Sequence, residues 1–582
     1  SQRYQAPTYL DGRARQRNVA RAARLTMHQA YRYQTFPFVR PPELTSGEVY
    51  RHPLVIIGCV PVGLAAAIDA RQHDIPVLLL DDDDTVSVGS RGLCYAKRTL
   101  EILDRLGCGD AVVAKGVGWD VGRTFFREEE VFNFNLRPQT GSKRPGMVNL
   151  QQYYLEEYMV KRALDAGVQI RWKNEVTAVS PHDDYVSIEV STPEGRYQVE
   201  ADWLIVADGA RSPIRSMLGL DVEGKVFMDR FLIADVLMKA DFPAERWFWF
   251  DPPFHRNQSV LLHREADDVY RIDFQLGWDA DPEEEKKPER VIPRIKAMLG
   301  DEREFSLEWV SVYTFQCRRM REFRHGRCLF AGDAAHQVSP FGARGANSGI
   351  QDADNLIWKL KLVIDGRAPL RLLDTYTDER GLSADENILN STRSTDFITP
   401  KGPVSQTFRN AVLELSRSLP FARKLVNSGR LSVPSFLTNS LLNTPDSEPF
   451  TGDMVPGAPM DDAPLMKNGQ PAWLIDQLGG KFQLLYFCED ASHITEARQR
   501  QLLGLAHAQI PIETLVIARR GTQSSLNVLL DQEGLAFARY DATDGTCYLV
   551  RPDQHVAARW RETEISRIVA AVTLATANFV EE

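Results

Sequence analysis

The stretch VIIGCVPVGLAAAI, residues 55–68, constrains the fold of this 582-residue chain more than any other. Its first half, with Leu54, reads as a short buried strand rich in β-branched residues, and LAAAIDARQH reads as a helix. The apolar run VLLL at 77–80 then predicts a second, parallel strand. Residues 54–84 therefore predict one strand–helix–strand unit, of the size expected for a βαβ crossover.

The turn between the first strand and the helix resembles a dinucleotide-binding turn with one departure. In Gly-x-Gly-x-x-Gly, the first glycine permits the tight turn, the second lets the backbone approach a pyrophosphate, and the third lets helix pack on strand. Gly58 and Gly63 take the first and third positions. Val60, followed by Pro61, stands at the second, where its branched side chain restricts φ. Alone, this turn is weak evidence, because a ligand-free strand–turn–helix gives the same pattern.

A run of four aspartates follows the second strand. Asp81 lies 23 residues past Gly58, where a carboxylate can accept hydrogen bonds from ribose hydroxyls. The alternative is that the run only solvates the strand end. The run also leaves the choice between Asp81 and Asp82 open.

Two further motifs repeat the pattern of a strand that ends in an aspartate. In ADWLIVADGARSPIRSMLGL, residues 201–220, the strand ends at Asp208. In CLFAGDAAHQVSPFGARGANSGIQDADNLIWKL, residues 328–360, the strand ends at Gly332 and Asp333, and a glycine-rich loop opens a helix near Asn347. A helix N-terminus offers free N–H groups and the positive end of a dipole to an anionic or electron-rich group.

Together, the three motifs resemble those of the single-component FAD-dependent aromatic hydroxylases, the family of p-hydroxybenzoate hydroxylase and phenol hydroxylase. The closer likeness is to the branch with 3-(3-hydroxyphenyl)propionate hydroxylase. The resemblance covers roughly residues 52–400, with a weaker match through 582. It implies an α/β and α+β fold: a Rossmann-like FAD-binding domain with an interleaved antiparallel-sheet substrate domain, and a C-terminal thioredoxin-like domain.

The resemblance also implies a set of FAD-binding residues. Gly58, Gly63 and Asp81 would hold the ADP half, Asp208 would serve both FAD and the nicotinamide cofactor, and Asp333 would bind the ribityl chain. The full set expected at the cofactor is Gly58, Val60, Pro61, Gly63, Asp81, Asp82, Arg91, Gln152, Asp208, Gly332, Asp333, Pro340, Gly342, Arg344, Gly345, Ala346 and Asn347. No metal site is expected.

Arg344 is a second departure from the family pattern, which often has glutamine or glycine at this position. It lies in the loop Gly342–Asn347, which with Pro340 would border the isoalloxazine ring. Its charge would either stabilise reduced, anionic flavin or pair with a carboxylate.

The activity implied by the resemblance is hydroxylation of a phenolic ring with NAD(P)H and O2. NAD(P)H reduces FAD, and O2 then gives a flavin C4a-hydroperoxide that attacks a ring carbon of the substrate. The flavin carries the hard chemistry, and the protein binds the ring and excludes water. NAD(P)H would dock transiently, because no second strand-linked glycine fingerprint is present.

The substrate domain is expected at about residues 225–320, inserted into an FAD-binding domain of 51–445. The sequence of this segment predicts a series of antiparallel strands. Six aromatic side chains gather there and either line a pocket for flat rings or fill a core: Phe227, Trp247, Phe248, Trp249, Phe250 and Phe254. Polar candidates for the site are His255, Arg256, His263, Arg264, Arg271, Tyr313 and His336, with Tyr95 and Lys97 expected near the flavin. The sequence assigns no catalytic base.

The two ends of the chain give weaker signals. Residues 1–50 hold eight arginines and three acids, and we expect a basic extension that packs on the body or on a second subunit. Residues 446–582 read as a linker and the thioredoxin-like domain. Only Cys488 follows its first strand, where a redox-active thioredoxin needs C-x-x-C, so we expect a redox-silent domain for packing or dimer contacts. A homodimer is therefore expected.

Composition narrows the class of protein. The net charge of −10 disfavours nucleic acid as a partner. No run of 18 apolar residues and no secretory signal is present, so we expect a cytoplasmic protein with no membrane span. The seven cysteines are scattered without a C-x-x-C, which indicates a reduced compartment, no zinc site and no disulfide framework.

Two alternatives stay open. The same motifs serve a tailoring monooxygenase or epoxidase that acts on a larger, polyketide-like aromatic. Val60 also leaves room for a catalytically weakened flavin-binding homologue. A flavin-dependent halogenase is disfavoured, because the chain has no W-x-W-x-I-P stretch.

Overall fold

The computed structural model of the chain describes residues 31–136, 140–429 and 431–579. Part of the expected N-terminal extension, residues 1–30, lies outside these ranges. The rest packs on the body: Tyr31 stacks on Tyr153 and Phe36 on Trp172, with ring centroids 4.3 and 4.4 Å apart. Within the described ranges, no helix is long and apolar enough to cross a membrane.

The first sheet is the parallel sheet that the motifs predict. Its strands run in the order β17-β18-β11-β1-β2-β8, and β18, β11, β1, β2 and β8 pair in parallel. Their bounds are β1 Tyr50–Ile57, β2 Val77–Leu80, β8 Gln169–Arg171, β11 Gly195–Val206, β17 Arg324–His325 and β18 Cys328–Phe330. The antiparallel strands β9 (Glu175–Pro181) and β10 (Val186–Thr192) extend it beside β11.

Helices pack against this sheet and against one another. The predicted helix after the glycine turn is α3 (Pro61–Gln72), which packs on α10 (Gly345–Ile364) and on α6 (Gln152–Asp165). The alanines of α3 are buried, which brings the neighbouring helices close. Other elements of this part are α2 Pro42–Ser46, α4 Lys97–Leu106, α5 Gly109–Lys115, α7 Pro213–Met217, β3 Cys94–Ala96, β4 Val117–Trp119, β7 Met147–Asn149 and α11 Arg371–Ile398.

The second sheet contains the strands expected to form the substrate domain, in the order β19-β16-β12-β15-β14-β13-β5-β6. Its bounds are β5 Val121–Phe126, β6 Glu129–Asn135, β12 Glu223–Leu237, β13 Arg246–Phe250, β14 Ser259–Arg264, β15 Val269–Leu276, β16 Ser306–Arg319 and β19 His336–Gln337. The expected segment, 225–320, supplies the centre of this sheet. Residues 121–135 complete it through β5, which pairs in parallel with β13.

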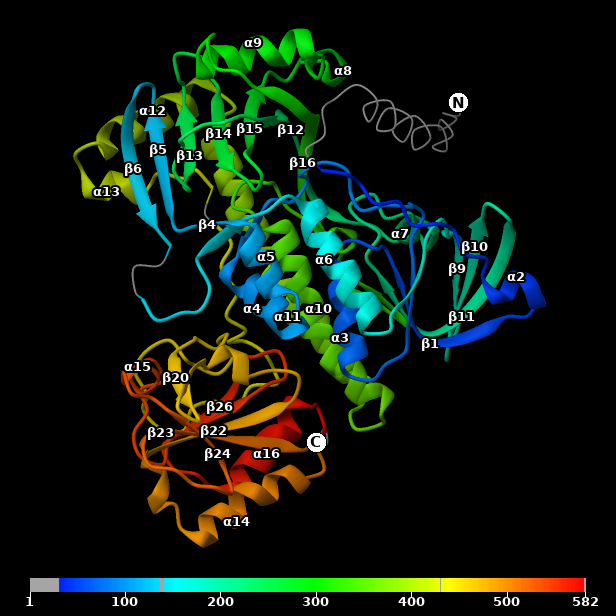
Figure 1. Ribbon diagram of the computed structural model, residues 1–582, viewed down its shortest axis with the longest axis vertical. Helices are drawn as coiled ribbons and strands as arrows, with labels where there is room; N and C mark the ends of the chain where they lie inside the picture. The colour runs from blue at the N-terminus through cyan, green and yellow to red at the C-terminus, as the bar shows by residue number, and fades with distance from the viewer. Residues whose placement is uncertain (1–30, 137–139, 430, 580–582) are drawn as a thin grey trace.

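Alternation along the strands of this sheet builds two separate cores. Phe248 and Phe250 share a core with Phe341, next to the glycine-rich loop, and we call this face FAD-facing after the expected cofactor; Trp247 and Trp249 lie on the opposite face. That outer face is covered by α9 (Pro288–Leu299), which follows the short α8 (Pro282–Glu285) (Figure 1). The aromatic cluster is therefore divided between the two faces.

The C-terminal part forms its own sheet, in the order β21-β20-β24-β23-β22-β25-β26. β22, β23 and β24 are parallel, β25 pairs antiparallel with β22, and β26 pairs antiparallel with β25. The bounds are β20 Pro464–Lys467, β21 Gln470–Trp473, β22 Phe482–Asp490, α14 Glu496–Gly504, β23 Ile512–Arg520, β24 Asn527–Leu530, α15 Leu535–Arg539, β25 Cys547–Val550, β26 Val556–Trp560 and α16 Ile565–Ala575. This domain lies below α10 and α11 in Figure 1.

Buried ion pairs fasten the C-terminal domain to the rest of the molecule. Arg551, just after β25, donates two hydrogen bonds to Glu379 on α11, at 2.6 and 2.9 Å. Lys359 on α10 donates to the same carboxylate, and Arg551 also pairs with Asp553. We call Lys359, Glu379, Arg551 and Asp553 the C-terminal charge cluster. Because α10 begins at the glycine-rich loop, this cluster anchors the helix that carries the loop.

Candidate active site

Four parallel strands end side by side, and each is followed by a sequence motif. The order β18, β11, β1, β2 places Gly332 and Asp333, then Asp208, then Gly58, then Asp81 along one edge of the sheet. In open α/β sheets, ligands bind in the crevice outside the carboxyl ends of the strands. The fold thus brings together motifs that lie far apart in the sequence.

The glycine turn keeps its close packing despite Val60. Gly58 has φ +108°, and a Cβ there would lie 2.3 Å from the carbonyl oxygen of Ala207, so only glycine fits. A Cβ on Gly63 would lie 2.0 Å from the Gly58 oxygen. Val60 caps α3 with φ −116° and ψ 170°, an ordinary extended conformation, and Pro61 takes the first helical position. The backbone at position 60 therefore does not require glycine.

Asp81 lies against this turn. Its carboxylate accepts hydrogen bonds from the backbone N–H of Cys59, at 2.6 Å, and of Asp83, at 2.8 Å. Burial and the neighbouring Asp82 raise the pKa of the Asp81 carboxyl to about 7. Asp81, rather than Asp82, therefore points to the turn, and a hydroxyl donor from a ribose would favour its charged form.

The segment after the aspartates, residues 85–93, forms a strap that contains Arg91 and is hydrogen-bonded to Gln152 on α6 and to Asp235 on β12. Gln152 opens α6 and accepts a hydrogen bond from the N–H of Gly92 at 2.7 Å, while it donates to Glu156. Glu156 in turn accepts two hydrogen bonds from Ser87. Gln152 thus holds the strap to α6, and the Arg91 side chain is exposed.

Asp208 has an unused acceptor. One oxygen accepts from the N–H of Ile214 at 3.1 Å, and the other is buried with no hydrogen-bond partner in the described structure. Burial raises the pKa of this carboxyl. This oxygen can therefore accept a hydrogen bond from a polar ligand at the strand ends.

The glycine-rich loop leads into α10 next to Asp333. The Asp333 side chain is exposed to the crevice. The surrounding protein still desolvates its carboxyl and so raises its pKa. A Cβ on Gly345, the first residue of α10, would lie 3.7 Å from the Asp333 carboxylate. Asn347 fixes this end of the helix, because its side chain accepts from the N–H of Ala96 and donates to the carbonyl of Cys94. The free N–H groups of α10 thus lie beside Asp333.

Arg344 points away from the loop it belongs to. Its guanidinium is buried and donates to the side-chain oxygen of Asn387 on α11 and to the carbonyl of Leu431. Pro340 and Ala346 are half-buried, and Gly342 is buried in the same loop. The charge of Arg344 therefore lies behind the loop.

The other polar residues that were expected near the substrate or the flavin do not lie together in the fold. His263, Arg271 and Tyr313 lie on the FAD-facing side of the substrate sheet, whereas Arg264 donates to Phe242 on the other side. His255 contacts the carbonyl of Gln275, and Arg256 is exposed beside Asp251. His336 is bonded to Asp352, and Lys97 pairs with Glu101 and Asp461. Tyr95 is fully buried, with its hydroxyl unpartnered among the described residues.

The FAD-facing side also holds a buried charge cluster around Arg271, whose three carboxylates the sequence analysis missed. Arg271 pairs with Asp273 at 2.8 Å and donates to the carbonyl of Ser90 at 2.6 Å. Asp235 accepts from the Ser90 hydroxyl, and both oxygens of Glu265 are buried without a hydrogen-bond partner within the described ranges. We call Asp235, Glu265, Arg271 and Asp273 the sheet charge cluster.

Burial changes the protonation of the sheet charge cluster. It raises the pKa of Asp235 to about 6, and burial together with Asp235 raises the pKa of Glu265 well above its ordinary range. Strongly perturbed carboxyls in such a place are typical of functional sites. The available sequence signal was a lone carboxylate inside an apolar strand: Asp235 in FLIADVL and Asp273 in VYRIDFQL.

Arg246 is a second residue that the sequence analysis missed. It pairs across the sheet with His263, is buried, and donates to the carbonyl of Ser428 at 2.6 Å. A Cβ on Gly429 would lie 3.2 Å from its guanidinium and 3.1 Å from the backbone nitrogen of Gly342. Burial lowers the pKa of Arg246 to about 10, so it is charged at neutral pH. A cation therefore lies next to the glycine-rich loop.

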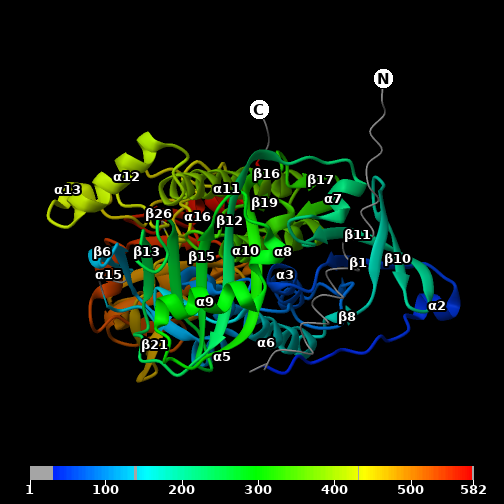
Figure 2. The same cartoon turned by 90° about the horizontal axis from the view of Figure 1, so that it is seen from above.

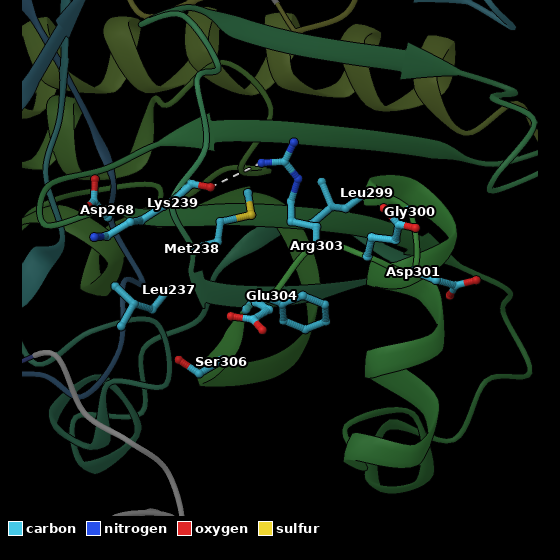
Figure 3. Close-up of a pocket in the computed structure, with 12 residues that line it drawn as sticks. Leu237, Met238, Lys239, Asp268, Leu299, Gly300, Asp301, Arg303, Glu304 and Ser306 are labelled. Carbon is cyan, nitrogen blue, oxygen red and sulfur yellow. Dashed lines mark hydrogen bonds between the residues drawn. The ribbon is translucent and has the colours of Figure 1, made fainter.

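A surface groove of the substrate domain lies apart from the residues expected at the cofactor. A groove of about 1190 Å³ opens between the end of β12 and the loop from α9 to β16 (Figure 3). Arg303 lies in it and donates to the carbonyl of Lys239 at 3.3 Å. None of the residues expected at the cofactor lines this groove.

Comparison with known proteins identifies the family. A family model described as an FAD binding domain matches residues 51–391, more than half of the chain. The chain belongs to the FAD-dependent aromatic hydroxylases. This hydroxylase is an FAD-dependent monooxygenase, and FAD is its cofactor.

Two curated relatives show the range of this family. The hydroxylase is 32% identical over 399 residues to 6-methylpretetramide 4-monooxygenase of Streptomyces rimosus, covering 65% of this chain and 68% of that protein. It is 25% identical over 530 residues to 3-(3-hydroxy-phenyl)propionate/3-hydroxycinnamic acid hydroxylase of Escherichia coli K12, covering 89% of this chain and 94% of that protein.

Solved structures share the fold of the hydroxylase. The flavin-dependent monooxygenase PieE, in complex with FAD and substrate, superposes with a TM-score of 0.75 at 22% identity, covering 90% of this chain and 98% of that chain. Aklavinone-11 hydroxylase with FAD and aklavinone gives 0.73 at 21% identity, covering 91% and 100%.

Proposed function

We propose that the protein hydroxylates a phenolic ring with NAD(P)H and O2. Membership of the monooxygenase family gives the reaction class. The observation that carries the substrate class is the buried cation Arg246, which lies beside the glycine-rich loop on the aromatic, FAD-facing side of the substrate sheet.

The residues at the strand ends fit FAD. The cradle at Gly58 excludes a side chain, Asp208 has an unused buried oxygen, and the N–H groups of α3 and α10 are available at helix N-termini. We propose that Gly58, Gly63 and Asp81 hold the ADP half of FAD. When bound, FAD accepts a hydride from NAD(P)H and activates O2 for insertion into the ring.

The chain's own groups bind the substrate and keep it dry. Arg246 provides a positive charge for the oxygen of a phenolate, and that charge favours the deprotonated, electron-rich ring. The phenylalanines of the same face exclude water from the ring. Burial, together with Arg246 and Arg271, lowers the pKa of His263, so the imidazole beside Arg246 is neutral and a weak base.

Two further parts of the proposal concern the domains. We assign residues 51–445 to the FAD-binding domain, with the sheet of residues 225–320 as its substrate side. The C-terminal domain, 446–582, is assigned a thioredoxin-like fold, supported by three parallel central strands flanked by two antiparallel ones. Cys488 is a buried, free thiol, which supports a redox-silent role.

A second candidate substrate is a fused-ring, polyketide-like phenol. The relative with 32% identity is named for 6-methylpretetramide, and a structure of the same fold holds aklavinone. A panel with single-ring and fused-ring phenols separates the two candidates.

The experiment is anaerobic reduction of the FAD-loaded enzyme by NADH or NADPH in the presence of each phenol. We expect one phenol class to accelerate loss of the oxidised flavin absorbance, and the Arg246→Gln variant to lose that acceleration. If every phenol leaves the reduction rate unchanged, and no hydroxylated product forms in air, the proposed function is wrong.

A further inference from the structure

The first described residues of the chain lie on α6 and on the strap. Residues 31–36 come before the range matched by the family model, 51–391, and we call them the N-terminal brace. Figure 2 shows this part of the chain, in dark blue, running past α6 towards α2. On α6, the Tyr31 ring stacks on Tyr153, and the Tyr31 hydroxyl donates to Glu157 at 2.7 Å. The brace is therefore seated on the helix to which the strap is also bonded.

The N-terminal brace also pairs with the strap itself. The N–H of Gly89 donates to the Tyr33 hydroxyl at 2.9 Å. The Thr85 hydroxyl donates to the carbonyl of Gln34 at 2.9 Å, and Thr35 forms an antiparallel β-bridge with Thr85. The brace thus contacts the first half of the strap through both backbone and side-chain groups.

Ring packing seats the brace independently of the Tyr33 hydroxyl. The Tyr33 ring lies edge-on to Tyr31 and Tyr153, with ring centroids 4.8 and 5.5 Å apart. Phe36 stacks on Trp172, which directly follows β8. Aromatic pairs of this kind stabilise a contact beyond the area that they bury. The hydroxyl of Tyr33 can therefore be removed while its ring keeps the brace in place.

The opposite side of the strap contacts the substrate sheet. A Cβ on Gly89, which has φ +79°, would lie 2.2 Å from the ring of Trp309 on β16. The Ser90 hydroxyl donates to Asp235 at 2.6 Å, and the carbonyl of Ser90 accepts from Arg271 at 2.6 Å. The strap therefore lies between the N-terminal brace and the sheet charge cluster, and two separate sets of contacts fix its backbone.

Arg91 is the charged residue that this arrangement places. Its carbonyl accepts from Arg271 at 3.4 Å, and the N–H of the next residue, Gly92, donates to Gln152 at 2.7 Å. The Arg91 side chain is exposed and forms no ion pair with another described residue. The strap leaves the sheet just after Asp81, the carboxylate at the glycine turn. A guanidinium in this position is available to the phosphates of a dinucleotide.

We propose that the N-terminal brace positions the strap for FAD, with Tyr33 as the positioning residue and Arg91 as the group that contacts the phosphates. The inference rests on the proposed FAD site at the strand ends. An arginine on a mobile segment binds weakly, because binding must then order the backbone that carries it. A strap that is held before FAD arrives avoids this cost, as any preorganised site does.

The first test compares two substitutions of the same kind within the brace. Tyr33→Phe removes the hydroxyl that binds Gly89, and Tyr31→Phe removes the hydroxyl that binds Glu157. Fluorescence of FAD added to the full-length apoprotein gives the Kd. We expect a rise of about 3–10-fold for Tyr33→Phe, the effect of one hydrogen bond, and no change for Tyr31→Phe. Equal Kd values in the two variants overturn the proposal.

The second test asks whether the brace acts through Arg91. Arg91→Ala should raise the Kd for FAD about tenfold or more, because a charged hydrogen bond is lost. In the Arg91→Ala background, Tyr33→Phe should add little, since residues that act as one unit are not additive. An Arg91→Ala variant with unchanged Kd, or fully additive effects of the two substitutions, contradicts the proposal.

The third test needs neither cofactor nor substrate. Trypsin cleaves after Arg91 when the strap opens, and the rate follows the open population if opening is fast. In the apoprotein, Tyr33→Phe should raise this rate about 3–10-fold. Cleavage after Arg256, which is exposed, is the internal reference and should not change. Unchanged cleavage after Arg91 in Tyr33→Phe overturns the proposal.

These tests are independent of the proposed hydroxylation. Neither the FAD affinity nor the cleavage rate involves a phenol. If no phenol is hydroxylated but Tyr33→Phe weakens FAD binding, the proposed function fails and the role of the brace stands. If a phenol is hydroxylated and Tyr33→Phe binds FAD like Tyr31→Phe, the role of the brace is wrong and the proposed function stands.

Discussion

The C-terminal charge cluster and the sheet charge cluster each hold four buried ionisable groups, but their charges are balanced differently. In the C-terminal charge cluster, Arg551 and Lys359 outweigh the effect of burial and hold the pKa of Glu379 low. In the sheet charge cluster, Arg271 is committed to Asp273, and the carboxyls of Asp235 and Glu265 have raised pKa values. The first cluster is electrically satisfied and the second is not.

The difference separates a structural role from a functional one. A fully paired cluster fastens two domains and gains nothing from a further ligand. A cluster with unpaired buried carboxyls lowers the free energy of unfolding. Proteins retain such unfavourable clusters mainly at functional sites, where the perturbed groups act on a ligand. We therefore assign the C-terminal charge cluster a structural role, which is to hold the C-terminal domain on α10 and α11. The sheet charge cluster, with Arg246, is assigned to the substrate side.

The largest expected effect on stability comes from disrupting the C-terminal charge cluster. Arg551→Leu leaves Glu379 buried with only part of its compensation, and the free energy of unfolding should fall by about 3–5 kcal/mol. Chemical denaturation measures it. Arg519→Leu is the control: its exposed pair with Glu489 should be worth less than about 1 kcal/mol. Equal losses in the two variants would remove the distinction between the clusters.

Arg246→Gln should affect substrate rather than stability. It removes a charged hydrogen bond to a phenolate, worth about 1.5–3 kcal/mol, so the Kd for the activating phenol should rise roughly 10–100-fold. Titration of the oxidised enzyme with the phenol, followed by the flavin spectrum, measures this. Arg246→Lys, which keeps the charge, should recover part of the affinity. An unchanged Kd in Arg246→Gln would place the substrate elsewhere.

Glu265→Gln should change how the free energy of unfolding depends on pH. A carboxyl whose pKa is raised by folding binds more protons in the folded state, so the free energy of unfolding falls as pH rises above about 4.3. Because glutamine does not titrate, the free energy of unfolding of Glu265→Gln does not fall with pH in this way. At pH 8 the variant should therefore be more stable than the unmodified protein, and at pH 4 the two should agree. Denaturation at both pH values is the measurement, and a variant less stable at pH 8 would show that ionised Glu265 is compensated.

The smallest effect concerns FAD itself. The Asp81 carboxyl has a pKa of about 7, and ribose hydroxyls favour its charged form, so FAD affinity should rise with pH up to about 7. The slope below that pH is at most tenfold per unit. Asp81→Asn should flatten the profile, whereas Val60→Gly should keep it. Fluorescence quenching of FAD on binding to the apoprotein gives these affinities.

The sequence predicted those elements whose signals are local. The strand–helix–strand unit, the strands before Asp208 and Gly332, and α10 follow from apolar runs and glycine turns. The joining of β5 to β13 depends on a pairing across more than a hundred residues, and no local pattern encodes it. Alternation placed aromatic residues on two faces, but the sequence does not say which face meets the flavin.

The candidate site divides in the same way. Gly58, Asp208 and Asp333 were found because each follows a strand in a recognisable motif. Arg246 and Glu265 were missed, because a buried charge is recognised only by its neighbours in space, here Gly342 and Asp235. Arg344 was expected at the flavin, yet its contacts with Asn387 and Leu431 became visible only in the fold.

The most direct test of the account is oxygen incorporation. The FAD-loaded enzyme is incubated with NADH or NADPH, a phenol that accelerates flavin reduction, and ¹⁸O₂, and the product is analysed by mass spectrometry. The account predicts one labelled hydroxyl on the ring, with much less product from Arg246→Gln at equal phenol concentration. Hydrogen peroxide as the only product, for every single-ring and fused-ring phenol, would contradict it.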